Sequence, residues 1–360
     1  MSAKRVVVIG GGYAGTRLAR ELDAVADVTL VDRKEAFFHR IASLRASVRR
    51  DWTDKPFISY GKLLAHGRVV HGTATGLDTE DKAVLLKSGE PLEYDVAVIA
   101  TGAEYHEPGR FVGATVEEAA KAFRDSQERF AAAAAVLVVG GGPAGVELSA
   151  EIKLVHPDTP VTLVHARERL LDGNHNPKLG DRALARLRAI GVDVRLGVTV
   201  SEPEPGRYVT SAGEAIKADT VIWATGTTPN TGWLRDHDGW LDGTGHVKVD
   251  GYLRAGGQSD VFAVGDVNNV PEAKLAQWAN AQGKAAAGSI RAVLDGKAPT
   301  KPYVPAKMKL MAVPLGPDDG VMLLPLSGQG VVAGAGMAKV IKSRGMFLSQ
   351  FRKALGQPAK

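Results

Sequence analysis

RVVVIGGGYAGTRLARELDAVADVTLVDR, residues 5–33, is the stretch of sequence that decides the fold. A short apolar run leads into three glycines, an amphipathic stretch follows, and a second apolar run closes the unit with the letters VTLV. This order predicts a strand, a tight turn, a helix and a second strand. Residues 136–167, VLVVGGGPAGVELSAEIKLVHPDTPVTLVHAR, repeat the same order. The two units together predict an α/β protein with two Rossmann-like dinucleotide-binding domains.

Each unit contains the pattern G-x-G-x-x-G between its first strand and its helix. In such a turn the first glycine permits the sharp bend, the second lets the backbone approach a pyrophosphate, and the third lets the helix pack closely on the strand. The free N–H groups and the positive dipole end of the helix favour phosphate. We therefore expect a dinucleotide at each turn. The residues assigned to the two turns are Gly10, Gly12, Tyr13, Ala14, Gly15, Gly140, Gly142, Pro143, Ala144 and Gly145.

The residue that ends the second strand of each unit distinguishes the two nucleotides. In the first unit it is Asp32, followed by Arg33, and a carboxylate there accepts hydrogen bonds from the ribose of an adenosine, which suits FAD. In the second unit it is His165, and Arg167 follows two positions on. A 2′-phosphate meets no carboxylate at this position and could pair with Arg167, so we expect the site to accept NADPH as well as NADH. The alternative is that His165 and Arg167 simply face solvent.

Further strand signals divide the chain into domains. Two apolar runs end in Ala-Thr-Gly, at Thr101–Gly102 and Thr225–Gly226, and a third ends at Gly265–Asp266 before an Ala- and Gln-rich helix. Residues after 300 are rich in proline and contain only short strand-like runs. The predicted division is an FAD-binding domain in residues 1–109 and 242–300, an NAD(P)H-binding domain in 110–241, and a small C-terminal α+β domain in 301–360.

Composition excludes several classes of function. The chain has 360 residues, 44% hydrophobic and 24% charged, which is ordinary for a soluble globular protein. A net charge of +5, spread along the chain, does not indicate nucleic-acid binding. The absence of cysteine excludes disulfide frameworks, iron–sulfur clusters, Cys-ligated zinc and dithiol chemistry, and we expect no metal site.

The expected location follows from apolar run lengths. The longest fully apolar run, Phe130–Val139, is shorter than the roughly 18–20 residues that a membrane span needs. The first apolar run is too short for a signal peptide, and Ser2 excludes N-myristoylation. We therefore expect a cytoplasmic protein, with peripheral contact to a membrane as an open alternative.

The order of these motifs resembles that of the two-dinucleotide-binding-domain flavoproteins. Within that superfamily, several segments are similar to the ferroptosis suppressor branch of the apoptosis-inducing-factor-like proteins, which is related to the non-pumping NADH dehydrogenases. These segments are FFHRIASLRASV at 37–48, FISY at 57–60, GGGPAGVELSAEIK at 140–153, VTLVH at 161–165 and KSRGMF at 342–347. The resemblance covers residues 4–350 and implies FAD, NADH or NADPH, and a quinone acceptor.

The resemblance also implies further cofactor contacts. It places Arg45, the backbone near Ala74, the Thr101–Gly102 pair and Asp266 against FAD, and Lys274, at the predicted start of the last long helix, belongs to the same group. A carboxylate at the position of Asp266, at a strand end beside a helix N-terminus, suits a ribityl hydroxyl.

Three residues are candidates for the chemistry. Glu147, in the first turn after the second glycine motif, could orient the nicotinamide or pass a proton; the alternative is a carboxylate that complements the helix dipole. Gln277 lies in AQWANAQG, which is similar to the A-Q-x-A-x-Q motif of the non-pumping NADH dehydrogenases, although the second Gln is displaced by one residue. Gln277 could bind flavin or quinone carbonyls, or it could belong to a core helix. Lys342 opens the KSRGMF segment.

The C-terminal segment Lys339–Gly356 alternates apolar with basic residues. Such a segment can rest on an anionic membrane surface, or it can pack within the protein or a homodimer. The oligomeric state, monomer or homodimer, stays open.

The leading functional hypothesis is an FAD-dependent NAD(P)H oxidoreductase that passes hydride to flavin and electrons to a quinone or another small acceptor. One alternative is a reductase for a ferredoxin. The other is a flavoprotein redox sensor that holds FAD and NADH in a charge-transfer complex with little turnover.

Overall fold

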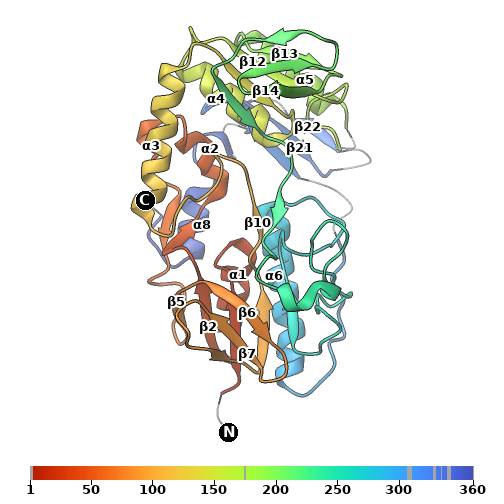
Figure 1. The fold of residues 1–360 in the computed structure, drawn as a ribbon. Helices are drawn as coiled ribbons and strands as arrows, with labels where there is room; N and C mark the ends of the chain where they lie inside the picture. Colours follow the sequence, from red (N-terminus) through yellow and green to blue (C-terminus); the bar gives the residue numbers. More distant parts are fainter. Residues whose placement is uncertain are drawn as a thin grey trace.

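The computed structural model describes residues 3–173, 176–305, 310–326, 330–333, 335–338 and 342–359. Two α/β halves lie one above the other (Figure 1), and strand β10 (Ala103–Glu104) runs between them, where it pairs with β18 (Thr228–Pro229).

The lower half in Figure 1 is built on a five-stranded parallel sheet. Helices α1 (Tyr13–Leu22) and α6 (Ala276–Leu294) pack closely, because a Cβ at Gly283 would lie 2.5 Å from the carbonyl oxygen of Ala14. The strands follow the order β19 (Val261–Ala263), β9 (Val96–Ile99), β1 (Arg5–Ile9), β2 (Asp27–Asp32) and β5 (Arg68–His71).

The upper half is built on a four-stranded parallel sheet. Its strands follow the order β13 (Asp193–Leu196), β12 (Val161–His165), β11 (Val136–Val139) and β17 (Thr220–Trp223), and its helices are α3 (Val116–Ala132), α4 (Pro143–Val155) and α5 (Lys178–Ala189). Helix α3 begins with a capping box in which Thr115 and Glu118 satisfy each other's free backbone N–H groups. The prediction of an α/β fold with two Rossmann-like units is confirmed; the domain boundaries stay a prediction.

Smaller elements complete the chain. The antiparallel sheets are β3 (Ala36–Phe38) with β4 (Phe57–Ser59), β6 (Ala74–Asp78) with β7 (Ala83–Leu86) and β8 (Leu92–Glu93), β14 (Val200–Glu204) with β15 (Arg207–Thr210) and β16 (Ala215–Ile216), and β20 (Met311–Pro314) with β21 (Gly320–Leu324) and β22 (Val331–Ala333). The short helices are η1 (Arg40–Ala42), α2 (Ser43–Ala46), η2 (Arg50–Trp52), η3 (Arg235–Trp240), α7 (Ala335–Ala338) and α8 (Leu348–Ala354).

The two glycine turns have the same local geometry. Gly10 has φ +109° and a Cβ there would lie 2.3 Å from the carbonyl oxygen of Ala100, just beyond β9. Gly140 has φ +118° and a Cβ there would lie 2.5 Å from the corresponding oxygen of Ala224, just beyond β17. At Gly15 and at Gly145 a Cβ would lie 1.9 Å from the carbonyl oxygen of the first glycine of the same turn. Only glycine fits these positions, and each turn lies beside an Ala-Thr-Gly strand end.

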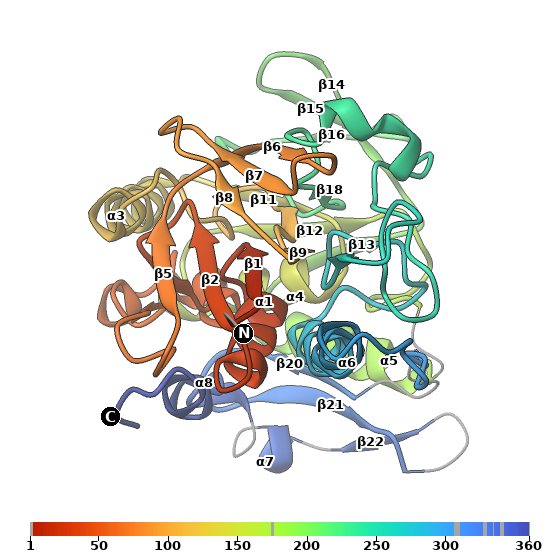
Figure 2. The ribbon, with the colours of Figure 1, turned by 90° about the horizontal axis from the view of Figure 1, so that it is seen from below.

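The C-terminal region shares its core with both halves. Strands β20 and β21 contribute Val313 and Val321 to the apolar cluster of the upper half, whereas Leu355 joins the cluster of the lower half. In Figure 2 these strands lie along one side of the molecule, beside α6 and α5. Among the described residues, no helix is both long enough and apolar enough to cross a bilayer.

Candidate active site

A cavity of about 350 Å³ lies where the first glycine turn, the start of α4 and the C-terminal region meet. It brings together residues that the sequence assigned to the site from five separate segments. These are Gly10, Gly12, Tyr13, Ala14, Arg33, Thr101, Gly102, Pro143, Ala144, Glu147, Gly265, Asp266, Lys274 and Lys342.

Asp32 is buried beside the first glycine turn, and both oxygens of its carboxylate accept hydrogen bonds. Oδ2 accepts hydrogen bonds from the backbone N–H of Gly11 at 2.6 Å and from the hydroxyl of Tyr60 at 2.9 Å. The Lys34 ammonium lies 2.7 Å from Oδ1. Burial alone would raise the pKa of Asp32, but Lys34 and the hydrogen bonds outweigh it and hold that pKa below its usual range. The carboxylate is thus ionised, as ribose binding requires. Sequence reasoning missed Tyr60 and Lys34.

His165 takes the corresponding place in the second unit. Its Nδ1 accepts a hydrogen bond from the backbone N–H of Gly141 at 3.1 Å, as Asp32 does from Gly11. Its Nε2 is buried, and the backbone of Arg169 lies close enough to interact with the ring. Burial lowers the pKa of His165, so the ring is neutral and Nε2 carries the proton. This placement does not agree with a ring that simply faces solvent.

Arg167 is mostly exposed and forms an ion pair of 2.6 Å with Asp172, a residue that the sequence did not indicate. Contrary to the expectation from the sequence, a carboxylate lies beside His165 and Arg167: Asp172 pairs with Arg167 and also interacts electrostatically with His165. A 2′-phosphate would have to compete with Asp172 for the guanidinium of Arg167.

This arrangement predicts the preference between the two nicotinamide cofactors. The wild-type protein should use NADPH within about tenfold of NADH, which corresponds to roughly 1.4 kcal/mol of transition-state discrimination. His165→Glu should shift the ratio of kcat/KM toward NADH by charge repulsion, whereas Asp172→Asn should shift it toward NADPH by releasing Arg167. Steady-state kinetics with both cofactors measure the ratios. Unchanged ratios in both variants would show that this corner does not face the ribose.

A second cavity, of about 330 Å³, adjoins the first on the side of the second unit. It is lined by Gly142, Trp223, Ala224 and Gly226, and Thr225 lies beside Gly140. Five residues line both cavities: Arg40, Leu44, Tyr105, Pro143 and Ala144. Ligands of the two glycine turns would therefore meet at one shared boundary.

Tyr105 and Arg40 form part of that boundary. The Tyr105 hydroxyl donates to Oδ2 of Asp266 at 3.1 Å, and the Arg40 guanidinium lies 3.7 Å from the centre of the Tyr105 ring. Burial, reinforced by Asp266, raises the pKa of Tyr105, so the hydroxyl stays a donor. Asp266 thus lies in the cavity, as predicted, with two neighbours that the sequence did not indicate.

Glu147 and Lys342 form a buried ion pair on the cavity wall. Lys342 Nζ lies 2.8 Å from Glu147 Oε1 and also donates to the carbonyl of Ala312 at 2.8 Å. Burial raises the pKa of Glu147, and the charges of Lys342 and Arg45 oppose that shift only in part. Glu147 is the fifth residue of α4, beyond the first turn where the dipole acts most strongly, so a role as a dipole partner has little support.

Two predicted FAD contacts lie outside the cavity lining. Arg45 is fully buried, and its Nε donates to Glu151 Oε1 at 2.6 Å. Ala74 lies on β6, where it pairs with Leu86 of β7. Arg45 thus belongs to an internal ion pair and Ala74 to a small antiparallel sheet, and contact of Arg45 or of the backbone near Ala74 with FAD stays a prediction.

Gln277 also lies outside the cavity lining. Its Nε2 donates to the carbonyl of Leu310 at 2.8 Å, so the side chain ties α6 to the C-terminal region and does not line the cavity. The other glutamine of the motif lies closer to the site. The Oε1 of Gln282, which is buried, accepts the backbone N–H of Gly265 at 2.7 Å and the Asn268 amide at 2.7 Å, and so holds the loop that carries Asp266.

The apolar residues of the C-terminal segment pack within the chain. The Phe351 ring lies 5.0 Å from that of Tyr13 and 6.2 Å from that of Phe37, and Met346 is 1% exposed. These contacts support internal packing over a membrane-facing surface for this part. Lys339, Val340 and Ile341 lie outside the described residues.

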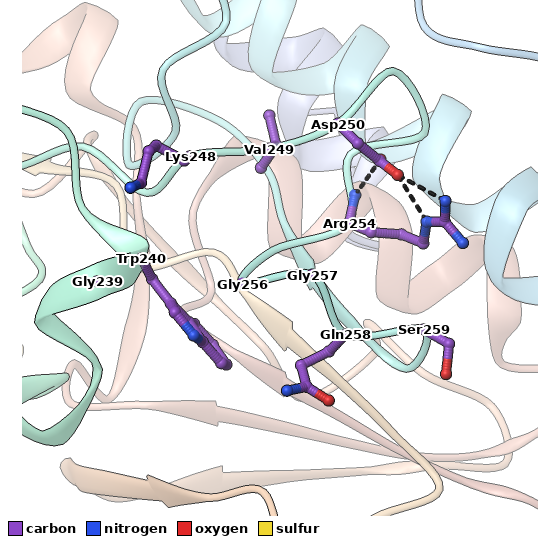
Figure 3. Close-up of a pocket in the computed structure, with 10 residues that line it drawn as sticks. All are labelled: Gly239, Trp240, Lys248, Val249, Asp250, Arg254, Gly256, Gly257, Gln258 and Ser259. Atoms are coloured by element: carbon purple, nitrogen blue, oxygen red, sulfur yellow. Dashed lines mark hydrogen bonds and ion pairs between the residues drawn. The ribbon is translucent and has the colours of Figure 1, made fainter.

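A larger cavity, of about 470 Å³, lies beside η3 and is shown in Figure 3. Its aromatic residue, Trp240, stacks on His237 at 4.2 Å and covers the Cα of Gly256. Its guanidinium, on Arg254, is held by Asp250 at 2.7 Å. Trp240 and Arg254 thus already contact neighbouring residues of the protein. None of the predicted site residues lines this cavity.

Both glycine turns fit a dinucleotide. Nothing lies within 4 Å of a Cβ built on Gly12 or on Gly142, so the middle glycine of each turn borders open space at a helix N-terminus. That space and the ionised Asp32 are features that a pyrophosphate and an adenosine ribose require.

Known proteins are similar to this chain over nearly its whole length. The family model described as pyridine nucleotide-disulphide oxidoreductase matches residues 4–285. Ferroptosis suppressor protein 1 of Homo sapiens is 32% identical over an alignment of 367 positions, which covers 99% of this chain and 96% of that protein. Apoptosis-inducing factor homolog B of Dictyostelium discoideum is 30% identical, over 99% of this chain and 97% of that protein.

Solved structures show the same fold. A NAD-dependent persulfide reductase from A. fulgidus superposes with a TM-score of 0.67 at 23% identity, over 88% of this chain and 63% of that one. The putidaredoxin reductase–putidaredoxin complex gives a TM-score of 0.67 at 21% identity, over 90% of this chain and 81% of that one.

Proposed function

Because the chain belongs to the pyridine nucleotide-disulphide oxidoreductase family, and is thus an FAD- and NAD(P)H-dependent oxidoreductase, we propose that it is an NAD(P)H:quinone oxidoreductase. The observation that carries this proposal is the buried Glu147–Lys342 pair in a chain that contains no cysteine. Without a dithiol, electrons cannot pass to a disulfide of the protein and must leave to an external acceptor.

The residues that line the cavity suit a quinone as the acceptor. Quinone reduction takes up two electrons and two protons, and Glu147 and Lys342 are groups that can hold a proton on the cavity wall. The lining of the cavity also includes the apolar residues Phe38, Ile41 and Phe111, which suit a flat apolar ring.

The residues of the chain have separate tasks in this proposal. Bound FAD would accept hydride from the nicotinamide and pass two electrons to the acceptor. The first glycine turn and Asp32 bind FAD, and the second turn and His165 bind NAD(P)H. Because the pKa of Glu147 is raised, its carboxyl can carry a proton at a higher pH than an exposed carboxyl, and Lys342 orients Oε1. The boundary that the two cavities share would hold the nicotinamide against the flavin.

Anaerobic turnover separates this function from its alternatives. The purified holoenzyme is mixed with NADH or NADPH and with one acceptor at a time from a panel of short-chain quinones, a ferredoxin and, separately, oxygen. We expect sustained oxidation of the nicotinamide only with quinones. Turnover with ferredoxin alone would indicate a ferredoxin reductase, and a stable long-wavelength charge-transfer band with no turnover would indicate a redox sensor.

A further inference from the structure

A buried ion cluster lies behind the cavity wall. Glu151 is 2% exposed, and both of its carboxylate oxygens are held: Arg45 Nε lies 2.6 Å from Oε1 and Arg49 Nε lies 2.8 Å from Oε2. The guanidinium of Arg45 also lies 4.9 Å from the centre of the Trp52 ring. Burying charges is costly unless they are paired, so this cluster has a geometry that tolerates little change.

Arg45 connects the cluster to the pair at the active site. Its Nη1 donates to the carbonyl of Ser343, the residue next to Lys342. Its partner Glu151 lies four residues after Glu147 on α4, and therefore on the same face of that helix. One guanidinium thus joins α2, α4 and the 342–343 segment. Of the two groups that Arg45 binds, Glu151 lies one helical turn from Glu147, and the carbonyl of Ser343 belongs to the residue next to Lys342.

We propose that Arg45 and Glu151 are a positioning pair, which holds the 342–343 segment so that Lys342 stays bonded to Glu147. The proposal rests on the function proposed for Glu147 and Lys342. Neither Arg45 nor Glu151 lines the cavity, so both act through the Glu147–Lys342 pair and not on a ligand.

The geometry explains why an arginine is needed. The planar guanidinium donates from Nε to the carboxylate and from Nη1 to the carbonyl at the same time. A lysine carries one ammonium on a flexible stem and cannot reproduce this fork. Arg45→Lys keeps the positive charge but can form only one of the two hydrogen bonds. Because the Glu151 carboxylate is the stronger acceptor, the hydrogen bond to the carbonyl of Ser343 is the one that is lost.

The test uses the FAD-loaded protein in the variants Arg45→Lys, Glu151→Gln and Lys342→Met, and the double variant Arg45→Lys/Lys342→Met. The first readout is independent of turnover: the reactivity of the Lys342 amine toward a small acylating reagent, measured by mass spectrometry. We expect it to rise severalfold in Arg45→Lys and Glu151→Gln, because a lysine released from its ion pair with Glu147 is more exposed to the reagent.

The second readout is the pH profile of flavin reduction by NADH in anaerobic stopped flow. The charged groups that face Glu147 are Lys342, Arg45 and Glu151. Displacing Lys342 removes a cation, so the acidic limb should move to higher pH and the rate should fall about tenfold. In the Lys342→Met background, Arg45→Lys should add less than about twofold, because the two residues act as a unit.

Arg49→Met is the matched control. Arg49 binds the same carboxylate of Glu151 but has no hydrogen bond to Ser343 among the described contacts. It should lower the thermal unfolding temperature and leave Lys342 reactivity and the pH profile unchanged. The proposal is overturned if Arg49→Met reproduces the changes of Arg45→Lys, if Lys342 reactivity stays constant in Arg45→Lys, or if the rate losses multiply in the double variant. Failure of the proposed function is distinguished by a separate result: the Lys342→Met variant then has the same rate of flavin reduction as the wild-type protein.

Discussion

Glu147→Gln is expected to slow the reduction of bound FAD by NADH about 10- to 100-fold while FAD stays bound, which is the range that one acid–base or positioning contact contributes. The amide has the shape of the carboxylate but neither its charge nor its proton, so Lys342 loses its partner. Because burial raises the pKa of Glu147, the wild-type rate should titrate above the usual range of a carboxyl group. The variant should show no such titration.

Anaerobic stopped flow measures the two half-reactions separately. Reoxidation by quinone should slow as well, because Glu147 is also a group that is proposed to hold a proton for the quinone. Glu128→Gln, which removes an exposed carboxylate on α3, is the control and should leave both rates unchanged. A Glu147→Gln variant with wild-type rates in both half-reactions would remove Glu147 from the mechanism, and a variant impaired only in reoxidation would limit its role to the acceptor side.

Gly12→Ala and Gly142→Ala should weaken binding of different cofactors with little change in the fold. At both positions an added Cβ meets nothing within 4 Å in the protein, so the methyl group would crowd only a bound pyrophosphate. Overpacking of this kind costs about 1–3 kcal/mol, or roughly 10- to 100-fold in affinity. Gly12→Ala should lose FAD, and Gly142→Ala should keep FAD and show a raised Kd for NAD(P)H.

Each variant is the control for the other. The wild-type protein should carry one non-covalent FAD for each chain, read from its flavin absorbance, and titration with NADH gives the second affinity. Gly10→Ala should instead unfold or destabilise the protein, because its Cβ would collide with the backbone at Ala100. Loss of FAD from Gly142→Ala, with FAD retained by Gly12→Ala, would show that the two sites had been exchanged.

The parts of the site that the sequence predicted well depend on local geometry. Gly10, Gly12 and Asp32 lie within one strand–turn–helix–strand unit, and their spacing determines where they meet. Repetition of that unit was enough to place His165 opposite Gly141, in the manner of Asp32 and Gly11.

The parts that the sequence could not predict depend on contacts between distant segments. Arg45 contacts Glu151 and Ser343, which are 106 and 298 residues away in the sequence. A local sequence pattern cannot predict contacts over such separations. Tyr60, just beyond β4, reaches Asp32 from 28 residues away, and Gln282 of α6 reaches Gly265 from 17 residues away. The AQWANAQG motif contains both Gln277 and Gln282. The sequence favoured Gln277 as a site residue, but its side chain ties α6 to the C-terminal region, whereas Gln282 holds the loop beside the site.

The most direct test is a double-mixing stopped-flow measurement on the wild-type holoenzyme without oxygen. NADH or NADPH first reduces the flavin, and a short-chain quinone is then added while the flavin spectrum is followed. We expect complete reoxidation by quinone in one two-electron step, fast enough to support steady-state turnover and faster than reoxidation by oxygen. A reduced flavin that stays reduced in the presence of excess quinone, or that is reoxidised only by a one-electron protein acceptor, would contradict the assignment.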